Sequence, residues 1–469
     1  MARTERRRRR GRRALLWVTG VLVLALAGGA AAAYETGRLD DWFGDGPAPP
    51  LVAPVPGFTP SPVPTPGVVA RTAPSPRPTT ACVRRALQPE MSDPHLFDLR
   101  AVVAPLTGHP VLDVGKGTST PASTLKLLTT TAALRVLGPR HTFATRVMAD
   151  GRRSIVLVGG GDPFLEDQQP TSGAGRHDAS LQTLAADTAG RLHRRGVDEV
   201  RLAYDASLFS GPRVNPHWPK TYVPEGVVSP ITALWADEGL NPVGYGRVPD
   251  PPATAAKLFA AYLHQRGIEV DGQVSERKPR AHAAELARVT SPSVADIVER
   301  VLQTSDNEGA EVLAHQVGLK VEGEGSFSAG VRGVRSTLEG LGVDLRRATI
   351  QDGSGLSRHD RLEAETLVEV LQLAASPDHP DLRSVVTGLP VAAYDGSLAY
   401  RFDDSRARGL VRAKTGTLTG TSALAGLTTD AKGRALLFAF VSNHVKYAQT
   451  LDTRAALERL TTSLATSHC

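Results

Sequence analysis

The chain has 469 residues, of which 41% are hydrophobic and 22% charged, so it can bury a large core in two or three structural units. Its net charge of +6 is concentrated at one end, because residues 1–13 contain eight Arg and one Glu, a net of +7, and the remainder carries 6 − 7 = −1. A nearly neutral body excludes a large cationic groove, so we expect no nucleic-acid partner.

A basic segment followed by a long apolar run marks the N-terminus. Residues 1–13 include five consecutive arginines, and residues 14–33 are apolar or small. An apolar run of about 20 residues behind a basic flank predicts a transmembrane anchor with its basic end in the cytoplasm. A cleaved signal peptide is the alternative, since Ala30 to Ala33 offer a small-residue cleavage site, but the run is long for a signal core and favours the anchor. Both alternatives place the rest of the chain outside the cytoplasm.

Residues 34–80 are interpreted as a proline-rich linker, because their repeated prolines favour an extended, stiff chain that cannot form a core. We expect the folded part to begin near Cys82, one of two cysteines in the chain. The other cysteine is the last residue, Cys469. In an exported protein, two cysteines can form a disulfide, although two free thiols at frayed ends are the alternative.

The hydrophobic patterns predict a series of helices and strands. In chain order they are a hairpin over 99–114, a helix over 122–137, a strand over 154–158, helices over 253–266 and 294–302, and a second hairpin with strands at 423–427 and 435–441. Hairpins near both ends with helices between them favour an α+β sheet domain that is interrupted by inserted material.

Three short motifs occur in the order Ser123-Thr124-Leu125-Lys126, Ser305-Asp306-Asn307 and Lys414-Thr415-Gly416. Each is common by itself and fits an exposed helix face, a polar turn or a strand end. Together they are the set found in β-lactamases and penicillin-binding proteins. Ser123 and Lys126 share one helix face, and the preceding proline places the serine near the helix N-terminus, where the dipole favours developing negative charge.

The use of lysine strengthens this interpretation. Only nine of the 54 basic residues are Lys, yet both Lys126 and Lys414 fall within the motifs. A general base must lose its proton, which a lysine near another cation can do and an arginine cannot. Lysine at these positions in an arginine-rich chain therefore indicates catalysis.

From about Leu99 to the C-terminus, the chain resembles the class C low-molecular-mass penicillin-binding proteins, a family of D-alanyl-D-alanine carboxypeptidases and endopeptidases. The resemblance rests on the three motifs and on matches at 159–163, 352–358, 395–398 and 413–417. Ser123 and Ser305 are 305 − 123 = 182 positions apart, which suits the inserted domains of this family and is too long for a class A β-lactamase. The resemblance implies an antiparallel sheet with helices, the transpeptidase fold shared with β-lactamases. We expect the catalytic domain in 81–150 and 286–469, and inserted non-catalytic domains in 151–285.

The resemblance also implies roles for the residues of the first two motifs. Ser123 attacks the carbonyl of the penultimate D-alanine, and Lys126 takes its proton. Ser305 relays a proton toward the leaving D-alanine, and Asn307 binds the substrate amide. Water then releases the acyl group, and no metal or cofactor is expected.

The third motif binds the end of the substrate in the same scheme. Lys414 keeps the first-motif lysine partly neutral and attracts the terminal carboxylate, to which Thr415 hydrogen-bonds. Gly416 and Thr417 belong to the same substrate-binding strand, and the backbone amides of Ser123 and Thr417 form the oxyanion hole. Asp352 in the neighbouring Asp-Gly-Ser-Gly sequence is interpreted as turn chemistry.

The implied substrates are peptidoglycan stem peptides, and the implied inhibitors are β-lactam antibiotics. The resemblance further implies that the first and last segments of the catalytic domain pack together, which would bring Cys82 close to Cys469. Two alternatives remain. A β-lactamase would hydrolyse a chromogenic cephalosporin quickly, and a catalytically silent wall-binding protein would not be labelled by penicillin.

Overall fold

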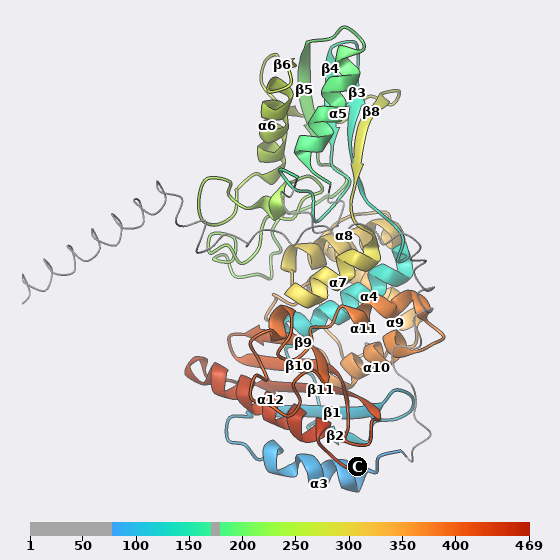
Figure 1. Ribbon diagram of the computed structural model, residues 1–469, viewed down its shortest axis with the longest axis vertical. Coiled ribbons are helices and arrows are strands. Elements are labelled where there is room, and N and C mark those ends of the chain that lie inside the picture. Colours follow the sequence, from blue (N-terminus) through green and yellow to red (C-terminus); the bar gives the residue numbers. More distant parts are fainter. Residues whose placement is uncertain (1–76, 170–178) are drawn as a thin grey trace, which may run out of the picture. The chain divides into compact units, whose positions relative to one another are not determined.

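The computed structural model describes residues 77–169 and 179–469 (Figure 1). The predicted basic segment 1–13, the apolar segment 14–33 and nearly all of the linker 34–80 lie outside the described residues. Among the residues that are described, no helix combines the length and the apolar character needed to cross a bilayer.

The first of two sheets has five strands, all antiparallel, and is built from both ends of the described chain. Their order across the sheet is β2 (Leu112–Val114), β1 (Leu99–Pro105), β11 (Ala435–Asn443), β10 (Thr421–Thr429) and β9 (Val411–Leu418). β1 pairs with β11 along its whole length, with Val102 opposite Ala439. The two hairpins predicted near the chain ends are therefore confirmed, and they join into one sheet.

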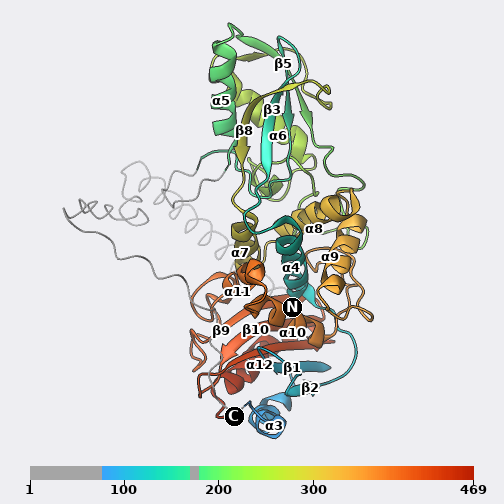
Figure 2. The ribbon, with the colours of Figure 1, turned by 90° about the vertical axis from the view of Figure 1, so that its right-hand side faces the viewer.

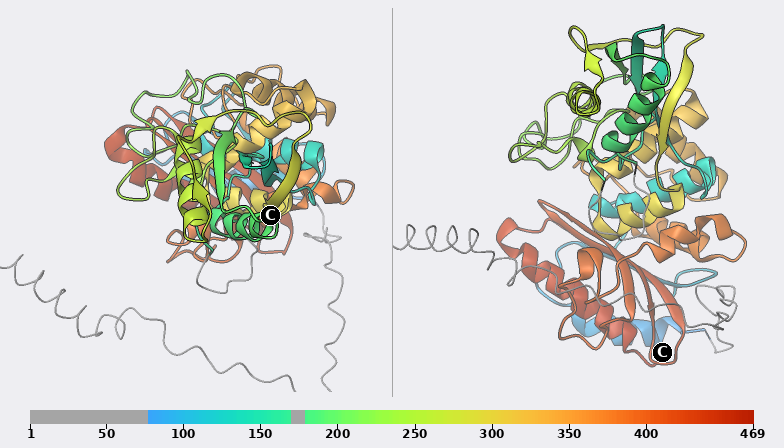
Figure 3. Two further views of the ribbon diagram at one scale, coloured as in Figure 1. Left: turned by 90° about the horizontal axis from the view of Figure 1, so that it is seen from above. Right: turned by 45° about the horizontal axis from the view of Figure 1, so that its top comes forward.

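Alternate residues of the central strands are buried on opposite faces of this sheet. On β1, Ala101 and Val103 belong to one apolar cluster, whereas Val102 and Ala104 belong to another. The first cluster is completed by α3 (Thr80–Met91) and α12 (Thr450–Ala465), which pack against each other, and the second by a larger group of helices (Figure 3). The sheet is thus the middle layer of three, and its central strands read as apolar because both faces are covered.

The larger helical layer carries the first two motifs. Its helices are η1 (Ala122–Leu125), α4 (Lys126–Leu137), α7 (Val294–Thr304), α8 (Asn307–Glu322), α9 (Phe327–Gly340), α10 (Ala364–Ala375), η3 (Pro380–Leu382) and α11 (Arg383–Thr387). α4 contacts α7, α8, α9 and α10 (Figure 2). Every residue from Lys126 to Leu134 along it is buried. A helix that is buried around its whole circumference belongs in the centre of a core.

The second sheet is formed by the middle of the chain. Its strands run in the order β6 (Glu269–Val270), β5 (Glu199–Asp205), β4 (Ser154–Val158), β3 (Ala144–Ala149) and β8 (Ala284–Thr290), with β7 (Ser275–Glu276) also paired to β5. Helices α5 (Leu181–His193) and α6 (Pro251–His264) complete its separate apolar core. The remaining short helices are η2 (Asp237–Gly239), η4 (Gly396–Leu398) and η5 (Tyr447–Gln449).

The second sheet extends beyond the predicted boundaries 151–285. β3 lies before residue 151, and β8 continues to Thr290. β3 and β8 pair with each other. Phe143, just before β3, and Ser291, just after β8, share two hydrogen bonds, from Ser291 N to Phe143 O at 2.8 Å and from Phe143 N to Ser291 Oγ at 2.9 Å. The chain thus leaves the helical layer and returns to it at one place.

The predicted elements agree with the structure apart from their ends. β4 matches its predicted range, α6 is shifted by two residues relative to 253–266, and α7 extends two residues beyond 302. The helix predicted over 122–137 needs a correction, because its first four residues form the 3₁₀ turn η1 and the α-helix begins at Lys126. Ala122 has a positive φ of 48°, which is incompatible with an α-helical first turn.

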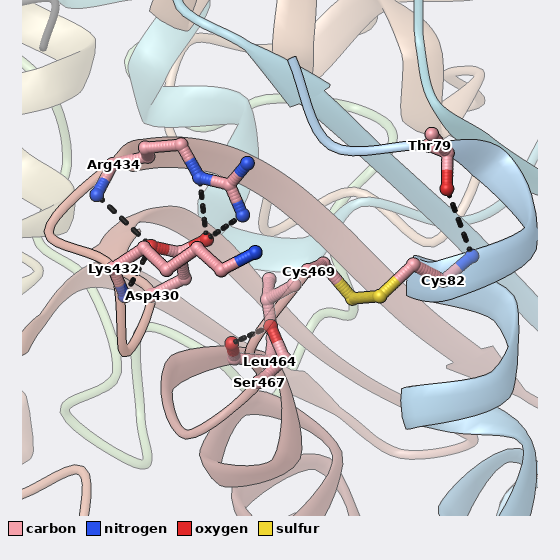
Figure 4. The surroundings of a disulfide bond; sticks show 8 residues. All are labelled: Thr79, Cys82, Asp430, Lys432, Arg434, Leu464, Ser467 and Cys469. Atoms are coloured by element: carbon pink, nitrogen blue, oxygen red, sulfur yellow. Dashed lines mark hydrogen bonds and ion pairs between the residues drawn. A yellow bond between two sulfur atoms is a disulfide. The ribbon is translucent and has the colours of Figure 1, made fainter. Parts of the chain in front are cut away.

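The two chain ends meet at a disulfide. Cys82 on α3 is joined to Cys469, and their Cα atoms are 5.3 Å apart, within the range that a disulfide spans (Figure 4). The last residues are also held by backbone contact, since Ala431 N in the β10–β11 turn donates to Ser467 O at 3.0 Å. The C-terminus is therefore packed rather than frayed.

Candidate active site

The turn that carries Ser123 has an unusual backbone. Ala122 is fully buried in the left-handed region, which a residue with a Cβ rarely adopts and which costs on the order of 1–3 kcal/mol. The following 3₁₀ turn eclipses residues three apart in the sequence. As a result, Ser123 Oγ lies 3.0 Å from Lys126 Nζ.

Two glycines allow other segments to pack closely against this turn. A Cβ on Gly355 would lie 2.0 Å from Ala122 O, and its φ of +81° also favours glycine. A Cβ on Gly416, in β9, would lie 2.8 Å from Pro121 O. The third motif is thus brought against the turn of the first because its glycine has no side chain.

Lys126 is fully buried and is held by three oxygens. Besides Ser123 Oγ, its Nζ donates to Asn307 Oδ1 and to the backbone carbonyl of Ser354, both at 2.8 Å. Burial lowers the pKa of Lys126 to about 8, although nearby carboxylates, chiefly Asp352, act in the opposite direction. A substantial neutral fraction near pH 8 is what a general base at this position needs.

The second motif joins α7 to α8. Ser305 ends α7 in the left-handed conformation with φ 63°, and Asp306 caps α8 by accepting from Gly309 N at 2.8 Å. Asn307 is therefore the first residue of α8. Its Nδ2 donates to Val227 O at 3.1 Å, which leaves Oδ1 facing the first-motif lysine.

The third motif lies on β9, where Gly416 is opposite Ala423 and Thr417 is opposite Ser422 of β10. Lys414 is fully buried, and its Nζ donates to Thr415 O at 2.9 Å. Burial holds its pKa well below the ordinary lysine range, and the positive charges of Lys126 and Arg401 add to the effect. For Lys126 itself, burial is the principal cause of the lowered pKa, rather than the charge of Lys414 expected from the resemblance.

A further loop takes part in the site although no motif pointed to its role. Asp352 does stabilise a turn, since it accepts from Gly355 N and Ser357 N, both at 2.7 Å. The same turn presents Ser354 O to Lys126. Beneath it, the buried Glu311 accepts from Ser354 N at 2.8 Å. The one sequence signal for this role of Glu311 is a charged residue within a largely apolar stretch of α8.

Among the described residues, Glu238, Asp306 and Glu308 form a group whose carboxylate oxygens lie within 4.8 Å of one another, close enough to hold a metal ion. Burial raises the pKa of Glu238 to about 10 and that of Glu308 to about 7. Glu308 is also paired with Arg247 at 2.7 Å. A largely protonated carboxyl and one already bound to an arginine are poor ligands, so we assign no metal here.

The three motifs thus converge on one serine with a buried lysine beside it, an amide and a second buried lysine. An activated serine in this setting is the arrangement of an enzyme that transfers acyl groups through a serine ester. Comparison with known proteins narrows this class. Residues 84–246 and 241–464 match the D-Ala-D-Ala carboxypeptidase 3 (S13) family.

Curated relatives agree with the family match. The chain is 35% identical to a carboxypeptidase of Mycobacterium tuberculosis, over 86% of this chain and 89% of the relative. It is 33% identical to the carboxypeptidase DacB of Mycolicibacterium smegmatis, over 93% and 94% of the two chains. It is also 32% identical to a D-alanyl-D-alanine carboxypeptidase of an Actinomadura species, over 69% and 73%. The chain belongs to the D-Ala-D-Ala carboxypeptidase 3 (S13) family.

Solved structures support the fold. Penicillin-binding protein 4 of Haemophilus influenzae superposes with a TM-score of 0.66 at 22% identity, and the match covers 82% of this chain and all of that one. The predicted α+β fold of the penicillin-binding proteins is therefore confirmed.

Proposed function

We propose that the protein is a serine D-alanyl-D-alanine carboxypeptidase that cleaves peptidoglycan stem peptides through an acyl-enzyme on Ser123. The observation that carries this proposal is the 3.0 Å contact between Ser123 Oγ and the buried Nζ of Lys126. Family membership supplies the reaction and the substrate class.

The surroundings of Lys126 explain how it acts as a base. A neutral amine has two N–H groups and one lone pair. The carbonyl oxygens of Asn307 and Ser354 accept the two hydrogens, and the lone pair is left for the hydroxyl hydrogen of Ser123. The lowered pKa of Lys126 makes this neutral form accessible.

The proposed reaction has two steps, acylation of Ser123 and hydrolysis of the resulting ester. Ser123 Oγ bonds to the carbonyl carbon of the penultimate D-alanine while its proton moves to Lys126. The peptide C–N bond breaks, and the leaving D-alanine takes a proton relayed through Ser305. A water molecule attacks the resulting ester, and Ser123 regains its hydrogen. The backbone amides of Ser123 and Thr417 stabilise the oxyanion in both steps.

The third motif binds the carboxylate at the end of the substrate. Lys414 supplies positive charge, and the hydroxyl of Thr415 donates to a carboxylate oxygen. In the free protein this hydroxyl donates to Ser397 Oγ, in η4, at 2.9 Å, so it is held toward that serine before substrate binds. β-Lactams are proposed as inhibitors because they acylate the same serine. In a second Haemophilus influenzae structure, penicillin-binding protein 4 of that organism is complexed with a β-lactam.

We also propose an extracytoplasmic location with membrane attachment through residues 14–33, and a linker over 34–80. This proposal is supported by the basic flank and the apolar run in the sequence. Membrane fractionation of the full-length protein tests it, and recovery of a shorter, secreted form would favour cleavage instead.

The decisive experiment for the reaction is incubation of residues 77–469 with purified stem pentapeptides and with crosslinked dimers, followed by mass spectrometry. Release of the terminal D-alanine supports carboxypeptidase activity, and cleavage of dimers adds endopeptidase activity. Fast turnover of a chromogenic cephalosporin without either product would identify a β-lactamase. The absence of all three activities and of penicillin labelling would overturn the proposal.

A further inference from the structure

A short turn in the middle segment of the chain contacts the loop that holds Lys126. We name residues 215–218 the clamp turn. Asn215 Nδ2 donates to Gln351 O at 2.8 Å, and Trp218 Nε1 donates to Asp352 Oδ2 at 2.7 Å. The clamp turn therefore supplies two donors to adjacent residues of that loop.

These two contacts are buried. Asn215 is 2% exposed, Trp218 5% and Asp352 1%. Asp352 Oδ2 accepts from both Trp218 Nε1 and Ser357 N. Water cannot readily replace a lost donor at such a buried position, so removal of the indole N–H weakens the hold on this carboxylate. The side chain of Trp218 also packs edge-on against Phe327, with ring centroids 5.3 Å apart. The contact with Phe327 therefore helps to fix the orientation of the indole that donates to Asp352.

Asp352 transmits this contact to the catalytic lysine. Its other hydrogen bonds, from Gly355 N and Ser357 N, close the turn that contains residue 354. The carbonyl at the centre of that turn, Ser354 O, accepts from Lys126 Nζ at 2.8 Å. Three consecutive hydrogen-bonded steps thus connect the indole of Trp218 to the base.

We propose that Asn215 and Trp218 are positioning residues for Lys126, acting through the loop at 351–357. Neither residue touches the substrate in this role. They lie within the range 151–285, which the sequence assigned to inserted non-catalytic domains, and they supply no nucleophile or base. The inference rests on the proposed function, because it assumes that Lys126 activates Ser123.

The chain offers a matched control for the indole N–H. Trp235 belongs to the same apolar cluster as Trp218 and is also buried, but its Nε1 donates to Asp162 O and Pro163 O rather than to the 351–357 loop. Trp218→Phe and Trp235→Phe therefore remove the same indole N–H and the same ring volume from one apolar cluster. The difference between them isolates the connection to Asp352.

The experiment measures the second-order rate constant for acylation by a fluorescent penicillin, as a function of pH, for both variants and the unaltered protein. We expect Trp218→Phe to acylate roughly tenfold more slowly, because a small displacement of the base disrupts its alignment with Ser123. Trp235→Phe should acylate at close to the normal rate. Melting temperatures show whether the two variants lose similar stability.

The pH profile separates positioning from a merely structural role. The ammonium form of Lys126 is favoured by Ser354 O and by the Asp352 charge, so a loosened loop should lower the pH midpoint of acylation in Trp218→Phe. Trp235→Phe should keep the normal midpoint. The charged or titratable groups facing Lys126 are Asp306, Glu308, Glu311, Asp352 and Lys414.

Unchanged acylation and midpoint in Trp218→Phe would overturn the inference, as would equal losses in both variants. If Trp218→Phe does not fold, Asn215→Leu removes the neighbouring donor at similar side-chain volume. It must then show the slower acylation and lower midpoint, and normal values would refute the inference. Failure of the unaltered protein to acylate at all would instead overturn the proposed function, and this inference with it.

Discussion

Lys126 and Asn307 are 181 positions apart in the chain, yet Lys126 Nζ donates to Asn307 Oδ1 at 2.8 Å. This bond joins the start of α4 to the start of α8 in the larger helical layer. It has a fixed direction, because Asn307 Nδ2 is already engaged by Val227 O. The amine of Lys126, on α4, is therefore oriented by contacts to the start of α8 and to the loop at 351–357.

The first prediction concerns the nucleophile. Ser123→Ala removes the only atom that would form the ester, so covalent labelling by fluorescent penicillin should disappear. A gel and a peptide map of the labelled protein measure this, and a melting curve shows that the variant folds. Undiminished labelling of a folded Ser123→Ala protein would assign the nucleophile elsewhere.

The second prediction distinguishes the two buried lysines. Lys126→Arg should lower acylation at least about a hundredfold, because a permanent cation cannot accept the serine proton. Lys414→Arg keeps the positive charge near the third motif and should retain more activity. Acylation rate constants for both variants provide the measurement. Normal acylation by both would refute the general-base role of Lys126.

The third prediction is a pH dependence of acylation. Burial lowers the pKa of Lys126 to about 8, and in the proposed mechanism the neutral amine is the form that accepts the serine proton. The acylation rate should therefore increase as pH rises from 6 to 9, with a midpoint near 8, and should fall at lower pH as the amine becomes protonated. Stopped-flow rates with a chromogenic β-lactam test this. A rate that is flat across this range would contradict it.

The fourth prediction concerns stability. Burial raises the pKa of Glu311 to about 8, well above the ordinary glutamate value of 4.5. The folded state then binds this proton more tightly than the unfolded state, so the free energy of unfolding should fall as pH rises from about 4.5 to 8. Urea unfolding at several pH values measures the slope.

Glu311→Gln should make that slope shallower, since the amide does not titrate. Glu365→Gln, at an exposed position on α10, is the control and should leave the slope unchanged. Identical slopes in Glu311→Gln and the unaltered protein would show that Glu311 does not contribute.

The fifth prediction concerns the disulfide. Cys82 and Cys469 are separated by 387 positions, so a bond between them could contribute on the order of 5 kcal/mol in the chain-entropy treatment, although measured gains are often smaller. Reduction should lower the melting temperature without abolishing acylation. Mass spectrometry of the non-reduced protein should find a Cys82–Cys469 crosslinked peptide. Full alkylation of both thiols without a reductant would contradict it.

The sequence predicted the pairing of Ser123 with Lys126 and the outer hairpins of the first sheet. The spacing of Ser123 and Lys126 predicted their shared face, and the apolar alternation near both ends predicted the two hairpins. It did not predict the left-handed Ala122, because alanine carries no signal for that conformation. Nor did it predict the contact from Ser354, since the acceptor is a backbone carbonyl that any residue could provide.

The middle segment was harder to interpret for a related reason. Its predicted boundaries fall just after β3 and inside β8, and these two strands pair with each other in one sheet. A pairing between strands about 140 positions apart leaves no local pattern. Likewise, nothing near Trp218 indicates its partner, because the carboxylate of Asp352 is reached only through tertiary packing.

The two hydrogen bonds between Phe143 and Ser291 have a consequence for how such a chain could be assembled. Because the segment between them leaves and returns at one point, it is a transferable module, and a short connection could close the chain without it. A protein shortened in this way would keep all three motifs. It would lose Asn215 and Trp218, so Gln351 and Asp352 would need other donors. The chain could be closed without the module, but the loop at 351–357 depends on its hydrogen-bond donors. Exchange of the module between relatives would therefore require compensating changes at 351–357.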